Sequence, residues 1–106
     1  MKVADLSGKQ LDYWMYLHAS KVVGKTGTQA DFDKGYGKGE FQFSTDKTLL
    51  FDLTTTYQIR VQFLADEWLA STTSNSCYGE NPLEAACRLV VANTFGSEVE
   101  GTEEKG

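Results

Sequence analysis

Residues Tyr57 to Phe63 alternate apolar and polar side chains more strictly than any other part of the chain. A period of two places one set of side chains on each face of a β-strand, so one face can be buried while the other meets water. Similar alternation runs through Phe41–Ser44 and Leu49–Thr54, and Trp68–Thr72 can form a fourth short strand. The short connections between these segments favour antiparallel pairing. The centre of the chain therefore predicts an antiparallel sheet of three to four strands.

A first helix is predicted near the start of the chain, at about residues 8–19. Ser7 and Gln10 have the spacing of a capping box, in which the serine accepts from a backbone amide and the glutamine reaches back. After them comes an apolar stripe at helical spacing, formed by Leu11, Trp14, Met15 and His18.

A last helix is marked equally well. Asn81 fits the N-cap, Pro82 fits the first helical turn, and Gly96 fits the residue that ends the helix. Its predicted apolar stripe is Leu83, Ala86, Cys87, Val90, Val91 and Thr94.

Together these elements predict one α+β domain over residues 1–96, in which the sheet packs with an N-terminal and a C-terminal helix. Residues 22–40 hold five glycines and are predicted as turns around at most a short strand or helical turn. Residues 97–106 are predicted to be an acidic, disordered tail.

The charge of the chain excludes some partners. The net charge is −5, and residues 97–106 carry −3 of it, which leaves −2 for the other 96 residues. The folded part thus lacks the basic surface that direct nucleic-acid binding requires. The start has no signal-peptide pattern and no run reaches membrane-spanning length, so we expect a cytoplasmic protein with no membrane partner. In that compartment Cys77 and Cys87 are expected to be free thiols.

Three sequence motifs resemble catalytic or ligand-binding sites, but each lacks the neighbouring structure or partner residues that such a site needs. Ala19–Thr26 fits a relaxed phosphate-loop pattern, but a predicted helix precedes it where a strand is required. Asp31–Gln42 begins like a calcium loop, but Tyr36 and Gln42 occupy the positions of its required glycine and glutamate. His18 lies on a core-facing stripe without a predicted nucleophile or orienting partner. We therefore expect no enzyme activity, no metal and no cofactor.

One feature favours a binding function. The first helix carries Tyr13, Tyr16 and Leu17 on the flank away from its core stripe, so it is apolar almost all round. This flank is expected to be covered by the glycine-rich segment within the domain, by a second copy, or by a partner protein. Because tyrosine is frequent among interface hot spots, these three residues are the predicted partner-binding site.

The two ends of the chain resemble the NinX-like family of small phage proteins. Tyr78–Glu100 read Y-G-E-N-P-L-E-A-A-C-R-L-V-V-A-N-T-F-G-S-E-V-E, similar to the family's G-x-x-P-L-x-A-A-x-R-x-x-V-A-x-x-x-G-x-E-V. Met1–Trp14 resemble the family's opening helix, Ser44–Asp46 its S-T-D segment, and Asp66–Trp68 a later strand. Where the family continues with a glycine-rich G-G-P-I stretch, residues 47–51 here read K-T-L-L-F.

The resemblance implies a phage or prophage origin, and with it the cytoplasm of a bacterial host cell, and no known enzyme activity. The leading hypothesis is a phage-encoded accessory protein that binds a host protein or protein complex, with inhibition of a host defence system, as an anti-CRISPR protein does, as one version. Two alternatives stay open: a small-ligand, nucleotide-like binder with the glycine-rich segment as a lid, and a structural homodimer without catalysis.

Overall fold

The computed structural model describes residues 2–99. In chain order these residues form η1 (Val3–Asp5), α1 (Gly8–Val22), α2 (Gln29–Tyr36), η2 (Phe43–Thr45), α3 (Lys47–Tyr57), β1 (Arg60–Leu64), β2 (Glu67–Ser71), β3 (Ser76–Gly79) and α4 (Pro82–Phe95). Here α denotes an α-helix, η a 3₁₀-helix and β a strand.

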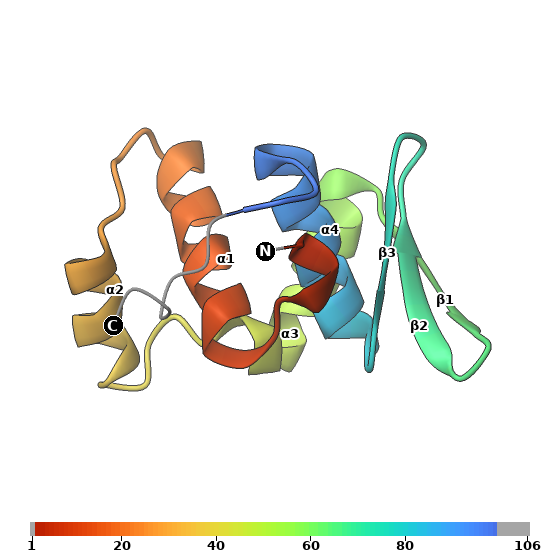
Figure 1. The fold of residues 1–106 in the computed structure, drawn as a ribbon, viewed down its shortest axis with the longest axis horizontal. Coiled ribbons are helices and arrows are strands. Elements are labelled where there is room, and N and C mark those ends of the chain that lie inside the picture. Colours follow the sequence, from red (N-terminus) through yellow and green to blue (C-terminus); the bar gives the residue numbers. More distant parts are fainter. Residues whose placement is uncertain (1, 100–106) are drawn as a thin grey trace.

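Helix α4 is the centre of the structure (Figure 1). One side of it packs on β2 and β3, and its other sides pack on α1 and α3. It is therefore buried almost all round, with eight buried residues: Leu83, Ala85, Ala86, Cys87, Leu89, Val90, Val91 and Ala92. The predicted α+β class, with an antiparallel sheet packed with the N- and C-terminal helices, is confirmed.

The sheet has the order β1-β2-β3 with antiparallel neighbours. A two-residue turn joins β1 to β2, and both of its residues, Ala65 and Asp66, have left-handed backbone angles (φ 50° and 68°). This is the type I′ geometry whose twist matches a hairpin. Val61 and Ala70 pair on the face toward α4, whereas Gln62 and Leu69 pair on the outer face.

Both terminal helices were predicted correctly. Helix α1 begins at residue 8 as expected and runs three residues beyond the predicted end. Ser7 occupies its N-cap position, although its side chain makes no capping hydrogen bond. At the far end Asn81 caps α4, since its side chain accepts from the Glu84 N–H, and Gly96 ends the helix with a φ of 95°.

The segment Leu49–Thr54 was predicted as a strand, and this is wrong, because it lies inside α3. Asp46 caps this helix through a hydrogen bond that its side chain accepts from the Thr48 N–H. Leu49 and Leu53 are four residues apart and both face the core. Phe51, which completed the apparent alternation, is 73% exposed.

Two other segments also differ from the prediction. Phe41–Ser44 forms no strand, since Phe41 has a left-handed φ of 60° and η2 begins at Phe43. Residues 22–40 hold more than a turn, because α2 spans eight residues. Its N-cap is Thr28, which accepts from the Asp31 N–H, and the side chain of Phe32 is fully buried.

Residues 97–99 belong to the domain. Lys2 and Glu98 form an isolated antiparallel bridge, and the Val3 N–H donates to the Ser97 carbonyl at 2.8 Å. Val99 lies in the core cluster. The contacts of the domain thus extend past the expected boundary at residue 96, and the rest of the predicted tail, residues 100–106, lies outside the described residues. Within residues 2–99, none of the helices has the length and apolar character needed to cross a membrane.

Both cysteines are free, as predicted, and both are buried, Cys77 in β3 and Cys87 in α4. Burial raises the pKa of both the Cys77 and the Cys87 thiols. Since the thiolate is the reactive form, neither cysteine is expected to react quickly with a water-soluble thiol reagent in the native protein. Titration with such a reagent should find two thiols after denaturation and almost none before; rapid native reaction would show that the core opens.

Candidate functional site

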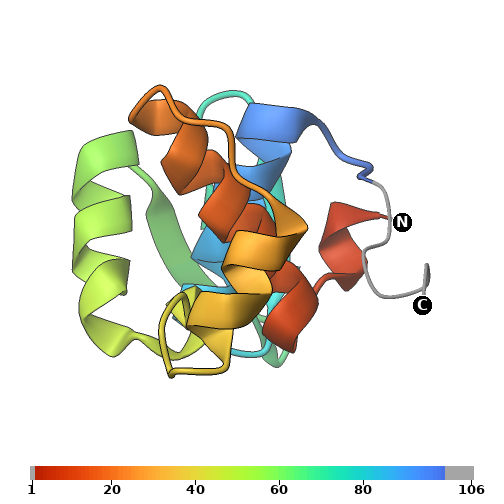
Figure 2. The ribbon, with the colours of Figure 1, turned by 90° about the vertical axis from the view of Figure 1, so that its left-hand side faces the viewer.

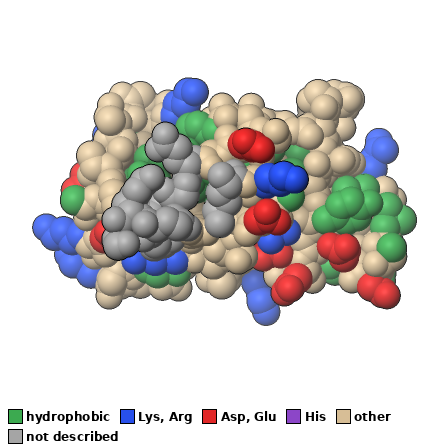
Figure 3. All heavy atoms as spheres, in the orientation of Figure 1, with side chains coloured by type: hydrophobic (Ala, Val, Ile, Leu, Met, Phe, Trp, Pro, Cys, Tyr) green, Lys and Arg blue, Asp and Glu red, His purple; other side chains and the backbone are tan. Residues whose placement is uncertain are grey.

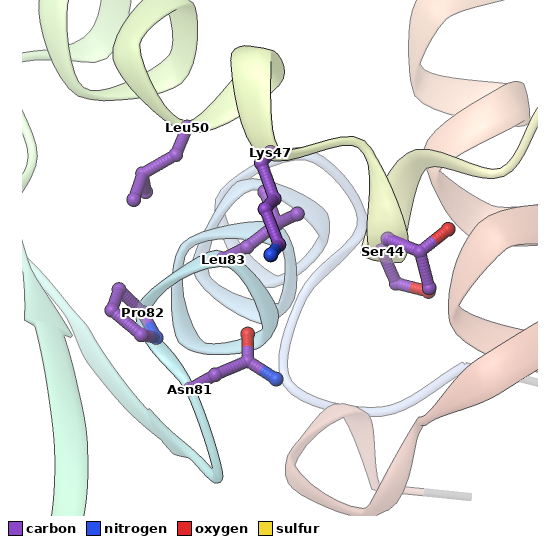
Figure 4. A pocket seen from close by; sticks show the side chains of 7 residues that line it. Ser44, Lys47, Leu50, Asn81, Pro82 and Leu83 are labelled. Atoms are coloured by element: carbon purple, nitrogen blue, oxygen red, sulfur yellow. The ribbon is translucent and has the colours of Figure 1, made fainter.

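A cavity of about 480 Å³ lies between the start of α3 and the start of α4 (Figure 4). Two segments far apart in the sequence form its walls, and they contribute Ser44, Thr45, Lys47, Leu50, Asn81, Pro82 and Leu83. In the close-up, Leu50 points toward Pro82 across the cavity, and Lys47 extends from α3 toward the start of α4. The volume is within the range typical of ligand pockets.

A buried carboxylate positions the first of these segments. Asp12 in α1 is 1% exposed, and its Oδ1 accepts from the Ser44 N–H at 2.7 Å. Burial raises the pKa of Asp12, while this hydrogen bond from Ser44 acts in the opposite direction. The bond holds η2 against α1 and so fixes the position where α3 begins.

Close backbone packing positions the second segment. Gly79, the last residue of β3, lies so near α4 that an added Cβ would be 2.5 Å from the Ala85 nitrogen. Arg88 of α4 joins this helix to β3 and to the residue after η1. Its Nε donates to the Leu6 carbonyl at 2.8 Å, and its Nη1 donates to the Tyr78 carbonyl at 2.7 Å. These contacts fix the start of α4 on the sheet.

The lining of the cavity is suited to binding. Leu50, Pro82 and Leu83 give it apolar walls. Lys47 is exposed and forms no ion pair with a residue in the described range. The Asn81 oxygen accepts from the Glu84 N–H at 2.8 Å, which leaves the side-chain NH₂ group of this lining residue as a donor. The site can therefore hold an apolar group that has a hydrogen-bond acceptor or negative charge beside it.

His18 is part of a separate polar cluster between three helices. Thr94 Oγ1 donates to the Val90 carbonyl, so it accepts from His18 Nδ1 at 2.9 Å. The Nε2 atom is then the unprotonated nitrogen, and it accepts from the Tyr57 hydroxyl at 2.8 Å. With both ring nitrogens bonded, His18 joins α1 to α3 and α4.

The environment of His18 predicts a pH dependence of stability. Burial lowers the pKa of His18, with a smaller contribution from the Lys21 charge, below the 6.5 of an ordinary histidine. Just below pH 6.5 the unfolded chain therefore binds a proton that the folded chain does not. The free energy of unfolding should keep the full contribution of neutral His18 above that pH and lose it as the pH falls toward the lowered pKa.

Urea unfolding at a series of pH values from about 7.5 to 5 measures this effect. The variant His18→Gln is neutral throughout that range, so its stability should depend less on pH than that of the wild type. Equal pH dependence in the two proteins would mean that folding does not lower the pKa of His18.

The predicted partner-binding residues lie at the interface of α1 with α2. Tyr13 and Tyr16 make ring contacts with Phe32 of α2, with centroids 5.3 and 5.6 Å apart, and Tyr16 also contacts the Phe41 ring at 4.7 Å. Leu17 is half-buried beside Gly27. Coverage of this flank within the domain, one of the three expectations, is confirmed. Tyr13, Tyr16 and Leu17 each remain partly exposed, and contact of a partner with these exposed parts stays a prediction.

The metal and phosphate motifs do not form the required structures. Helix α1 stands in the place of the strand that must precede a phosphate loop, and it continues through Ala19–Val22, which would have to form the loop itself. Asp31 and Asp33 lie within α2, and Asp33 pairs with Lys9 at 3.4 Å. Over residues 2–99, no three histidine, cysteine or acidic side chains are grouped closely enough to hold a metal ion.

The cavity residues Lys47 and Leu50 were missed because the helix that carries both was not predicted, and residues 49–54 were assigned to a strand. The signal that could have identified them is Asp46, a good N-cap residue directly before Lys47, followed by Leu49 and Leu53 at helical spacing. The meeting of this helix with the start of α4 depends on tertiary packing and has no sequence signal of its own.

Comparison of the chain with protein-family models, with curated proteins and with solved structures gave no match in any of the three.

Proposed function

We propose that this chain is a phage-encoded accessory protein of the NinX-like type that acts by binding a host protein. The observation that carries the proposal is the cavity between α3 and α4. It brings together two of the segments that carry the resemblance, Ser44–Asp46 and the start of Tyr78–Glu100, which are more than thirty residues apart in the sequence.

The lining indicates which group of a partner would enter. The walls from Leu50, Pro82 and Leu83 suit an apolar side chain such as leucine, methionine or phenylalanine. Lys47 and the Asn81 NH₂ group, which both belong to the lining, can pair with a hydrogen-bond acceptor or a carboxylate of the partner. The proposed partner therefore presents an apolar residue with an aspartate or glutamate next to it.

Affinity capture from host lysate, read by quantitative mass spectrometry, tests this proposal. The bait is the full chain as wild type, as the double variant Lys47→Glu/Leu50→Ala, and as Lys38→Glu. Lys38 is an exposed residue after α2 and provides the same charge change away from the cavity. A host protein should be retained by the wild type and by Lys38→Glu, and its capture should fall at least about tenfold with the double variant.

The same experiment separates the cavity from the α1 flank. Loss of capture with Tyr13→Ala/Leu17→Ala, and retention with the cavity variant, would move the contact to the flank predicted from the sequence. Melting temperatures of all baits must be compared, because both changes remove contacts inside the domain. If the wild type retains no host protein above an unrelated bait, the proposed function is rejected.

Inhibition of a host defence system is the specific version of this function. Cells that carry an active defence system and express the wild-type chain should become susceptible to a targeted phage, whereas cells expressing Lys47→Glu/Leu50→Ala should stay protected. Equal protection in the two strains would exclude this version for that system and leave the binding proposal to the capture experiment.

A further inference from the structure

Strand β1 is an open edge of the sheet. In an antiparallel pair, hydrogen-bonded and non-hydrogen-bonded residue pairs alternate, and the pair next to a two-residue turn, here Leu64 with Glu67, is hydrogen-bonded. The N–H and C=O groups of Val61 and Phe63 therefore point away from β2. Among residues 2–99 these groups have no backbone partner outside the sheet.

The opposite edge of the sheet is covered. Helix η1 packs beside β3, and the Tyr78 carbonyl of β3 accepts from Arg88 Nη1 at 2.7 Å. Pairing with another strand is therefore open at β1 and obstructed at β3.

Strand β1 also lacks most of the sequence features that prevent an edge strand from pairing with a strand of another chain. Edge strands usually carry a lysine, a proline or a bulge. The sequence of β1 is R-V-Q-F-L, without proline or lysine, and its register with β2 is regular along its whole length. Its one charged residue, Arg60, is at the first position. Phe63 is 56% exposed and Leu64 is 40% exposed, so pairing would also bury apolar surface.

We propose that two copies of this chain pair antiparallel through β1, about a two-fold axis at Gln62, to form one continuous six-stranded sheet. In this register the outward N–H and C=O groups of Val61 form hydrogen bonds with those of Phe63 of the second copy. By symmetry, Phe63 forms the same two bonds with Val61 of the second copy. Gln62 faces Gln62 of the second copy in a non-hydrogen-bonded pair, where opposite side chains are closest. The strand is thus complementary to itself.

The charges at the two ends of β1 favour the same arrangement. Arg60 begins the strand, whereas Asp66 and Glu67 follow its other end. Antiparallel pairing brings the arginine of each copy next to the acidic turn of the other, whereas parallel pairing would place the two arginines side by side. This complementarity favours a second copy over an unrelated strand from another protein.

Helix α3 adds to the contact area. Figure 2 shows α3 and β1 on the same side of the molecule, and Phe51 on this helix is 73% exposed. A specific interface usually buries at least about 1,000 Å² in total, more than a pair of five-residue strands provides. Phe63 on β1 supplies exposed apolar surface at this edge, and α3 supplies further surface on the same side of the molecule (Figure 2).

Sedimentation velocity of the purified full chain, from about 1 to 500 µM, tests the proposal. The wild type should shift from monomer to dimer across this range. Gln62→Lys and Gln62→Glu each place two like charges at the axis, so each should weaken dimerisation at least about tenfold. An equimolar mixture of the two variants should dimerise again, because opposite charges then meet. Ser76→Lys, an exposed change on the covered edge strand, should dimerise like the wild type.

Cross-linking gives a second readout. The variant Gln62→Cys should form a disulfide-linked dimer under mild oxidation, since non-hydrogen-bonded antiparallel positions bring Cβ atoms within reach of a disulfide, whereas Ser76→Cys should not. A wild type that stays monomeric at every concentration overturns the proposal, and so does a dimer that Gln62→Lys leaves intact. A mixture of the two charge variants that fails to associate rejects the two-fold axis at Gln62.

Discussion

Gly79→Ala is expected to lower the free energy of unfolding by about 3 kcal/mol or more, a large part of the total stability of a domain of this size. A Cβ at this position would be 2.5 Å from the Ala85 nitrogen and 2.9 Å from the Ala85 Cα. These are backbone atoms in the first turn of α4, so the contact can be relieved only by moving β3 away from the helix. Urea unfolding followed by circular dichroism measures the change.

Gly37→Ala is the matched control. Gly37 has helical backbone angles, and an added Cβ would come no closer than 3.5 Å to another atom. This substitution should leave the stability unchanged or raise it by up to about 1 kcal/mol, because it restricts the unfolded chain. If Gly79→Ala proves as mild as Gly37→Ala, the close approach of β3 to α4 is wrong.

Arg88→Ala is expected to cost about 3 kcal/mol or more. The side chain is 13% exposed and donates to the carbonyls of Leu6 and Tyr78, and it pairs with Glu84 at 3.5 Å. Truncation leaves two carbonyls without their donor and a mostly buried carboxylate without its cation. Chemical denaturation at neutral pH measures the loss.

Arg88→Lys separates charge from geometry. Lysine keeps the positive charge but cannot reach both carbonyls with the planar fork of arginine, so this variant should recover only part of the stability. Arg60→Ala, at an exposed strand position, should stay within about 0.5 kcal/mol of the wild type in dilute solution. An Arg88→Ala protein as stable as Arg60→Ala would show that the buried network contributes nothing.

The sequence predicts the terminal helices well because their signals are local. Asn81 and Pro82 start α4, Gly96 ends it, and the stripe between them has the helical period. Much of the G-x-x-P-L-x-A-A-x-R motif has a structural explanation as well. Gly79 permits the close contact with α4, and Arg88 joins η1, β3 and α4.

The middle of the chain was harder to predict because a short segment can satisfy two periods at once. Leu49 and Leu53 are four residues apart, a spacing that fits both a strand and a helix. Phe51 between them completed the alternation of a strand, although its side chain faces solvent. Helix α2 had a usable signal in the Thr28–Asp31 cap spacing, but the glycines around it concealed that signal.

The candidate site could not be predicted from local patterns. Its walls come from α3 and α4, and their meeting depends on the bond between buried Asp12 and Ser44 and on the contact between Gly79 and Ala85. The three residues chosen from the sequence, Tyr13, Tyr16 and Leu17, were identified correctly as a second apolar flank, and α2 covers much of it.

The outer face of the sheet is a second exposed surface, separate from the α3–α4 cavity. Figure 3 shows hydrophobic side chains gathered over the sheet at the right-hand end of the molecule, with acidic side chains beside them. Leu64 and Tyr78 on the outer face of the sheet are both partly exposed. A β1-paired dimer would place two copies of this face side by side, whereas each α3–α4 cavity is formed within a single chain.

Site-specific photo-cross-linking in host cells tests the binding proposal most directly. A photo-reactive amino acid replaces Thr45, an exposed residue that lines the cavity, or Lys38 in a matched control, so that Lys47 and Leu50 keep their proposed contacts. We predict that one host protein is joined to the chain from position 45, that position 38 does not join it, and that Leu50→Ala in the same chain reduces the yield. Equal labelling from both positions, or no host protein joined from position 45, would contradict the binding proposal.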